Sequence, residues 1–196
     1  SSNNFSALLK LSFNLFNGIR FSTLYSYSDD SWFGYDHSFK YNPDGRSGGH
    51  REAKYIALQL NHMITQKLFY ELKFSSVTNN YGSYLFENPL DQRYVHDRYF
   101  DSYGPGFLTG GQSKDHTIRN MIDQTLKLDA TWQVNHTHSI KTGLHYFNHE
   151  LDNQWHTIRN KYHNTANDSV YAPEIFGDLS AYADIYTVSP KEVAFY

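Results

Sequence analysis

The chain contains no cysteine, so no disulfide framework can hold it together. It has no run of about 18 apolar residues and therefore no transmembrane helix. Membrane strands remain compatible with the sequence, because their hydropathy signal is weak in each segment. The formal net charge of −3 is too small to indicate binding to nucleic acid or to an acidic surface.

The sequence also lacks the motifs of common enzyme and cofactor sites. No Gly-x-Ser-x-Gly elbow, His-Glu-x-x-His helix, phosphate loop or dinucleotide fingerprint occurs. The glycine-rich stretches 44–50 and 102–113 lack the strand-to-helix context of a phosphate loop, and we interpret them as mobile loops. Paired carboxylates such as Asp29 and Asp30 are common in turns and do not indicate a glycosidase. We expect no enzymatic activity and no bound cofactor.

Aromatic residues make up 17% of the chain, yet the mean hydropathy is only −0.65. This combination suits strands that are apolar on one side. In "LLKLSFNLFNGIRFSTLYSYSDD" (8–30), apolar and polar residues alternate on both sides of Asn17-Gly18, a pair that favours the positive φ angles of a two-residue hairpin turn. A helix over 6–16, capped by Gly18, is the alternative, but the alternation continues through the turn and favours strands.

The same period of two recurs along the chain and predicts about six strands. The further segments are 52–62, 68–77, 121–134 and 139–150, and Val193 and Phe195 begin a seventh. The connections alternate between short ones (17–18, 65–67 and 135–138) and long ones (29–51, 78–120 and 151–190). This order predicts an all-β fold: an antiparallel up-and-down meander with its tight turns at one end and its long loops at the other. Outer-membrane barrels have this asymmetry, whereas connections longer than about 15 residues are uncommon in compact domains.

The polar side of these strands is too charged to be a dry core, but it can line a watery lumen. It carries Lys10, Arg20, Glu71, Lys73, Asp123, Lys127, Asp129 and Lys141. Lipid is therefore the expected solvent of the apolar side, and the fold is expected to be part of a large transmembrane β-barrel. Tyr25, Tyr27, Tyr70 and Trp132 fall toward strand ends, where an interfacial aromatic girdle would lie, although packing across strands also explains them.

Three stretches resemble the barrel of TonB-dependent receptors from Bacteroidetes-like bacteria. They are "KLFYELKFSSVTNNYGSYLFENPLDQRYV" (67–95), "LDATWQVNHTHSIKTGLHYFNHEL" (128–151) and "YADIYTVSPKEVAFY" (182–196). A strand, an "ENPLDxRYV" loop and a "TWQxNxxHxIKTGLxY" hairpin follow one another in that order in such receptors. The likeness lies in strands and loops and includes no catalytic signature.

This resemblance implies a location in the outer membrane of a Gram-negative bacterium. It also implies contact with outer-membrane lipid, a plug domain that couples to the TonB complex, and uptake of a small nutrient such as an iron chelate, vitamin or oligosaccharide. A surface lipoprotein is a possible partner. Residues 1–196 are then expected to be a fragment of the barrel, without plug or signal peptide. A passive porin-type barrel and a secreted soluble glycan-binding β-domain are the alternatives.

The long loops interleave aromatic and polar residues, which suits stacking on sugar rings or flat chelates. The candidate ligand-binding residues are Trp32, Tyr35, Tyr84, Arg93 and Tyr103. The alternative is that these residues pack loop against loop and form a lid on the barrel.

The eleven histidines do not form a metal-binding pattern. His136 and His138 flank a tight turn and are expected to be solvated. His145 and His149 share the polar side of a strand and are expected to line the lumen. His156 and His163 are expected in a loop, exposed to solvent. No metal site is predicted.

Overall fold

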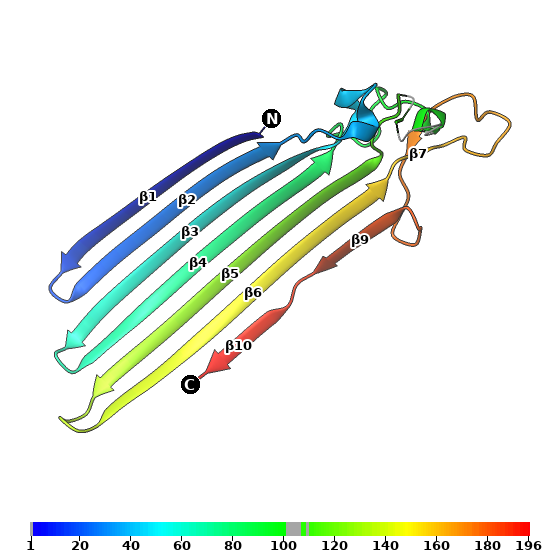
Figure 1. Cartoon of the computed structure of the whole chain (residues 1–196). Helices are drawn as coiled ribbons and strands as arrows, with labels where there is room; N and C mark the ends of the chain where they lie inside the picture. The colour runs from blue at the N-terminus through cyan, green and yellow to red at the C-terminus, as the bar shows by residue number, and fades with distance from the viewer. Residues whose placement is uncertain (1, 101–106, 109) are drawn as a thin grey trace.

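The computed structural model describes residues 2–100, 107–108 and 110–196, and its regular structure is almost entirely β. Six long strands follow one another in an antiparallel sheet in which each pairs with the next (Figure 1). They are β1 (Ser2–Phe16), β2 (Ile19–Trp32), β3 (Gly48–Thr65), β4 (Leu68–Tyr84), β5 (Asp115–Gln133) and β6 (Ser139–Thr157). The predicted all-β antiparallel meander is confirmed, and the helical alternative for 6–16 is wrong.

The sheet ends in an interrupted strand made of β9 (Ala183–Val188) and β10 (Lys191–Phe195), both paired with β6. Pro190 lies between them and has no N–H to donate, although its carbonyl accepts from the His149 N–H at 3.0 Å. Short elements occupy the long connections: η1 (His37–Phe39), η2 (Pro43–Gly45), η3 (Asp97–Phe100), β7 (Arg159–Asn160) and β8 (Pro173–Glu174). No helix in the described part of the chain is long and apolar enough to cross a membrane.

The tight turns lie together at one end of the sheet and the long connections at the other, as predicted (Figure 1). The strands, however, run further toward the loops than the sequence indicated. Asp29 and Asp30, expected in a turn, pair with Glu52 and Arg51 inside the sheet. The apolar–polar alternation stops there because both faces become polar, whereas backbone pairing needs no apolar side chain. β9 was also missed, because the whole of 151–190 was interpreted as a connection. Tyr25 and Tyr27 lie inside β2 rather than near its end.

The glycine-rich stretch 44–50 is not a loop throughout. Gly48 and Gly49 open β3, and Gly49 is the direct partner of Trp32 on β2. The first turn also differs from the expected form, because among the described residues of that turn only Gly18 has a positive φ, 83°. The register shifts between Asn14 and Phe16, so the hairpin closes through a bulge.

The register aligns the apolar residues of all strands in continuous rows on one face. Two such rows cross the sheet from β1 to β10. One contains Leu11, Thr23, Leu58, Phe74, Leu126, Tyr146 and Val193, and the next contains Phe13, Phe21, Leu60, Leu72, Leu128, Leu144 and Phe195. Within the described ranges no second layer covers them: Leu126 and Leu128, on a central strand, are 39% and 38% exposed.

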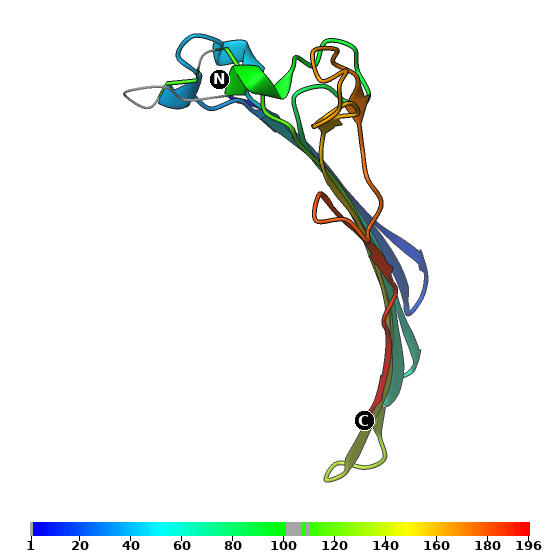
Figure 2. The ribbon, with the colours of Figure 1, turned by 90° about the vertical axis from the view of Figure 1, so that its right-hand side faces the viewer.

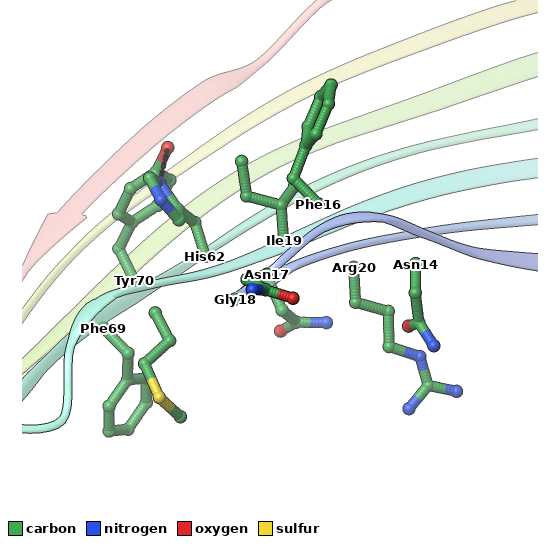
Figure 3. A pocket seen from close by; sticks show the side chains of 11 residues that line it. Asn14, Phe16, Asn17, Gly18, Ile19, Arg20, His62, Phe69 and Tyr70 are labelled. Carbon is green, nitrogen blue, oxygen red and sulfur yellow. Dashed lines mark hydrogen bonds between the residues drawn. The ribbon is translucent and has the colours of Figure 1, made fainter.

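The opposite face is polar, and the sheet bows along its strands (Figure 2). A hollow of about 320 Å³ on this face is lined by residues from β1 to β6, including Lys10, Gln59, Lys73 and His145. Figure 3 shows the division of faces at the first turn, where Arg20 and Asn14 point to one side and Ile19 and Tyr70 to the other. The polar face is therefore the hollowed one.

Candidate ligand-binding surface

The long connections between β4 and β5 and between β6 and β9 pack against each other around Lys114. Its ammonium group donates to the Tyr171 hydroxyl at 2.7 Å and to the Val95 carbonyl. It lies 3.8 Å from an Asp97 carboxylate oxygen, and only 12% of the side chain is exposed. Burial lowers the Lys114 pKa to about 8 and raises the pKa of Tyr171. Lys114 thus links its own segment to the one that contains Val95 and Asp97 and to the one that contains Tyr171. Its ammonium group loses part of its hydration in doing so.

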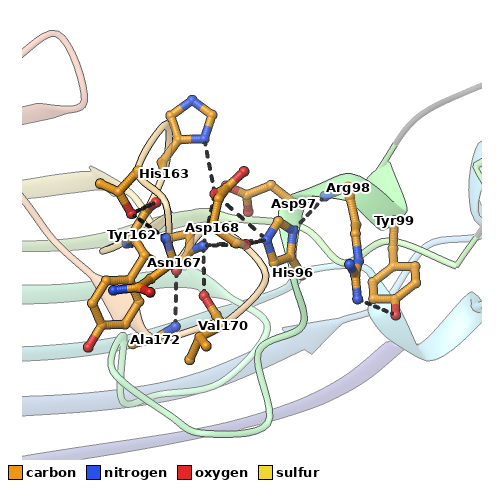
Figure 4. Close-up of polar contacts among 12 residues, drawn as sticks. His96, Asp97, Arg98, Tyr99, Tyr162, His163, Asn167, Asp168, Val170 and Ala172 are labelled. Atoms are coloured by element: carbon orange, nitrogen blue, oxygen red, sulfur yellow. Dashed lines mark hydrogen bonds and ion pairs between the residues drawn. The ribbon is translucent and has the colours of Figure 1, made fainter.

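Asn160, at 2% exposure, fixes the path of the connection that follows it. Its side-chain amide donates to the Val170 carbonyl at 3.0 Å, and its oxygen accepts from the Ala172 N–H at 3.1 Å. His96 reaches the same segment through the Asp168 backbone carbonyl (Figure 4). The two connections are therefore held together by polar contacts, as the loop-packing alternative expected.

The connection between β2 and β3 packs against the connection between β4 and β5. The Leu108 N–H donates to the Ser38 carbonyl at 2.8 Å, and the Ser113 N–H to the Gly45 carbonyl at 2.6 Å. The His37 and Phe107 rings meet edge to face with centroids 4.7 Å apart. All three long connections thus form one layer beyond the strand ends.

The prediction that His156 is an exposed loop residue is wrong. It is the penultimate residue of β6, is 7% exposed, and pairs with His116 on β5. The segment after β4 covers this position, because the His116 ring contacts the Glu87 carbonyl at 2.9 Å. His163 is exposed, as expected, and so are His136 and His138 beside their turn.

Two of the predicted ligand-binding residues, Tyr84 at the end of β4 and Arg93 in the connection that follows it, already contact other side chains. Tyr84 stacks on His116 with ring centroids 5.1 Å apart. Arg93 holds Asp91 through two hydrogen bonds of 3.0 and 2.8 Å and lies 4.1 Å from the Phe86 ring centroid. This contact with Arg93 lowers the Asp91 pKa to about 2. Both side chains already have partners within the chain.

The other predicted residues are placed differently. Tyr35 is 72% exposed, and its hydroxyl makes a 2.9 Å hydrogen bond with the His37 ring. Tyr103 lies outside the described residues. Trp32 ends β2, and its ring lies 6.2 Å from that of Tyr81 on β4. The structure therefore does not gather the four candidates that it describes into one site.

Trp32 instead adjoins a group of residues on the polar face, near the loop end of the strands, that sequence reasoning missed. Tyr81 has Arg51 as its direct partner on β3 and Arg119 on β5. These three residues, with Asn79 and Met121, line a hollow of about 330 Å³. These residues become neighbours only through the strand register. The register could not be derived from the sequence, because the strand ends and loop lengths were not known.

Further toward the turns, the polar face carries a line of rings on β6. His145, Phe147 and His149 follow at every second residue, with centroid distances of 3.9 and 5.8 Å. His149 hydrogen-bonds Asp123 at 2.8 Å. His145 and His149 thus share the polar face, as expected. Across the described ranges, no three His, Cys, Asp or Glu residues group closely enough to hold a metal ion.

Comparison of the chain with family models, with curated proteins and with solved structures gave no match.

Proposed function

We propose that the chain is a segment of an outer-membrane β-barrel of the TonB-dependent receptor type, without enzymatic activity. In this proposal the apolar face contacts the acyl chains of the outer membrane of a Gram-negative bacterium. The long loops capture a small nutrient, and the polar face forms its path. Coupling to the TonB complex would pass through a plug domain, and a surface lipoprotein is a further partner to test.

The observation that carries the proposal is the apolar band that crosses all strands and remains uncovered at the centre of the sheet. In water, such a surface would be a large exposed apolar patch, which soluble monomers rarely carry. Lipid removes that cost without requiring a second protein layer. The strand lengths also favour lipid as the solvent of the apolar face. A tilted membrane strand needs about 9–11 residues, and β5 has 19.

The opposite face needs water, because like charges lie directly across from one another. Glu71 pairs with Asp129, and Lys73 pairs with Lys127, on the neighbouring strands β4 and β5. Each carboxylate instead finds its ion pair along its own strand, and the Lys127–Asp129 pair measures 3.0 Å. Opposed like charges are destabilising in a sheet unless solvent screens them. A lumen supplies that solvent, whereas a dry interior does not.

The stagger of the hairpins fits a tilted barrel wall. Ile19, the first residue of β2, pairs with His62, and β3 continues past that point to Thr65. Leu68 pairs with Trp132, and the chain continues through Gln133 to the third turn. Each hairpin thus extends past the previous one in the same direction, as closure of a sheet into a barrel requires.

Two other functions use the same sheet. A passive porin would share the strands but have no plug, and finding a plug with a TonB-contacting segment in the same polypeptide separates it from the receptor. A soluble glycan-binding domain would bury the apolar face against a second sheet. A monodisperse, cooperatively melting product obtained without detergent would favour that soluble domain and overturn the membrane proposal.

The decisive experiment is spin labelling of the full-length protein in lipid bilayers. Single cysteines are placed at Leu11, Leu58 and Leu128 in a cysteine-free background; the 196 residues contribute no cysteine of their own. The matched controls are their polar-face neighbours Ser12, Gln59 and Lys127. We expect the first three labels to be relaxed by lipid-soluble oxygen and the controls by a water-soluble nickel complex. Equal accessibility of the two sets, or contact of the first set with protein side chains, would overturn the proposal.

A further inference from the structure

The polar face carries two arginines on either side of one tyrosine. Arg51, Tyr81 and Arg119 are direct cross-strand partners on β3, β4 and β5. Neighbouring strands lie about 4.8 Å apart, so the two arginine Cα atoms are about 10 Å apart with the tyrosine between them. The hollow of about 330 Å³ that they line with Asn79 and Met121 is large enough for one or two rings.

The two guanidinium groups retain free donors. Arg51 makes no hydrogen bond or ion pair with any described residue; its neighbour Asp30 accepts from the Asn4 amide instead. Arg119 uses its Nε to donate to the Asn153 Oδ1 at 3.0 Å. Its two terminal nitrogen atoms have no partner in the described chain. Both arginines are exposed to solvent.

Asn153 fixes the position of the Arg119 side chain. It is only 2% exposed, and its amide donates to the Asp184 carbonyl on β9 at 3.1 Å. The amide oxygen is thereby oriented toward Arg119. Because one guanidinium nitrogen is fixed, the fork of the other two presents the geometry that pairs with a carboxylate through two parallel hydrogen bonds.

An aromatic platform lies beside these cations. The Trp32 ring is 6.2 Å from the Tyr81 ring, and the planes are inclined by 32°. The Tyr81 hydroxyl has no hydrogen-bond partner among the described residues. Aromatic faces of this kind stack on sugar rings and on flat rings, while neighbouring polar groups fix the orientation.

We propose that Arg51, Tyr81, Arg119 and Trp32 form a binding site for a ring-shaped organic anion, whose ring stacks on the aromatic side chains and whose carboxylates pair with the arginines. An acidic oligosaccharide and an aromatic polycarboxylate share this chemistry. The site rests on the proposed function only in requiring that the polar face be open to water. The site predicts that the captured compound is negatively charged, whereas the candidate residues of the loops predict no particular charge.

The test measures binding of digalacturonate and of trimesate to the full-length protein in detergent, by titration calorimetry at low ionic strength. We expect at least one of the two to bind, and Arg51→Gln and Arg119→Gln each to weaken its binding at least about tenfold. The matched control is Arg20→Gln, which removes the same charge from the same face near the first turn and should leave affinity unchanged. Binding of digalacturonate alone identifies an acidic sugar site, and binding of trimesate alone an aromatic acid site.

Three results would overturn the site. They are no binding of either compound, equal binding of the neutral methyl ester of digalacturonate, and an equal loss of affinity in Arg20→Gln. Arg51→Lys keeps the charge without the fork and is expected to retain part of the affinity, which separates lost recognition from lost folding. Failure of binding while the spin labels still report lipid would refute the site alone. Failure of the spin-label test would refute the proposed function.

Discussion

The indole ring of Trp32 lies across the backbone of Gly49, its direct partner on the neighbouring strand. A Cβ at Gly49 would come within 2.2 Å of the indole Cε2 atom. Only a residue without a side chain allows the ring to lie there and to face Tyr81. A glycine that looks like part of a loop in the sequence thus positions an aromatic side chain at the proposed site.

Gly49→Ala is expected to displace the Trp32 ring and increase its exposure to water. In the full-length protein with every tryptophan except Trp32 changed to Phe, Trp132 and Trp155 among them, the fluorescence of Trp32 should shift to the red and be quenched more strongly by acrylamide. Gly48→Ala is the matched control, because its added Cβ would meet its nearest neighbour at 3.6 Å, an ordinary contact. A shift of equal size in both variants would contradict the role of Gly49.

Gly18→Ala is expected to destabilise the first hairpin by about 1–2 kcal/mol, the cost of a side chain at a left-handed position. Gly18 has a φ of 83°, and an added Cβ would lie 2.7 Å from the Met63 carbonyl oxygen. Urea unfolding of the protein in detergent measures the change. Gly177→Ala, where no atom lies within 4 Å of the added Cβ, should be neutral.

The loop layer is expected to become more stable as the pH rises above about 8. Burial lowers the Lys114 pKa to about 8 from an ordinary value of 10.5. Between these values the unfolded chain binds more protons than the folded one, so stability increases with pH, by about 1 kcal/mol per unit. Below the folded pKa the cost of burying the charged form is present in full.

Native-state proteolysis between pH 7.5 and 9.5 measures this dependence as a fall in the cleavage rate of segment 85–100. The comparison is with Lys114→Met, which removes the titrating group, so that its rates report only the pH dependence of the protease. Identical pH profiles for the two proteins would show that Lys114 is not coupled to loop packing.

Asn160→Ala is expected to loosen the connection between β6 and β9 by about 1–2 kcal/mol, because it removes the two hydrogen bonds by which the Asn160 side chain holds the backbone of Val170 and Ala172. The rate of proteolytic cleavage within 161–182 should rise by at least about tenfold. Asn167→Ala alters an exposed amide of the same loop and should leave that rate unchanged. Equal rates in the two variants would mean that Asn160 does not fix the loop.

Much of the fold could be predicted from the sequence, because one-sided burial imposes a period of two on every strand. Leu58 and Leu128 were placed on the apolar face, and Lys73 and Asp129 on the polar face, from alternation alone. The strand ends could not be found in this way. Past Tyr27 both faces are polar, and the pairing that continues to Trp32 depends on backbone hydrogen bonds that leave no periodic trace.

The candidate site was less predictable, since it depends on register. The aromatic residues of the long connections were visible in the sequence, but Tyr84 and Arg93 already have partners within the chain. Arg51, Tyr81 and Arg119 are far apart in the chain and become neighbours only through two strand pairings. Of the predicted residues that the structure describes, only Trp32 adjoins them.

The two edges of the sheet predict how the 196-residue chain behaves alone. All residues of β1 are exposed, and the outer edges of β1 and β9–β10 have no partner strand among the described residues. Lipid does not tolerate unpaired backbone groups, and in water such edges pair with other chains. We therefore expect the isolated chain to self-associate and to give no defined unitary conductance in planar bilayers. Proline substitutions in β1 at positions whose N–H points outward should reduce the self-association, because they remove the donors of that edge without disturbing the pairing with β2. A stable single-channel conductance from the isolated chain would show instead that it closes its own edges, either within one molecule or between copies.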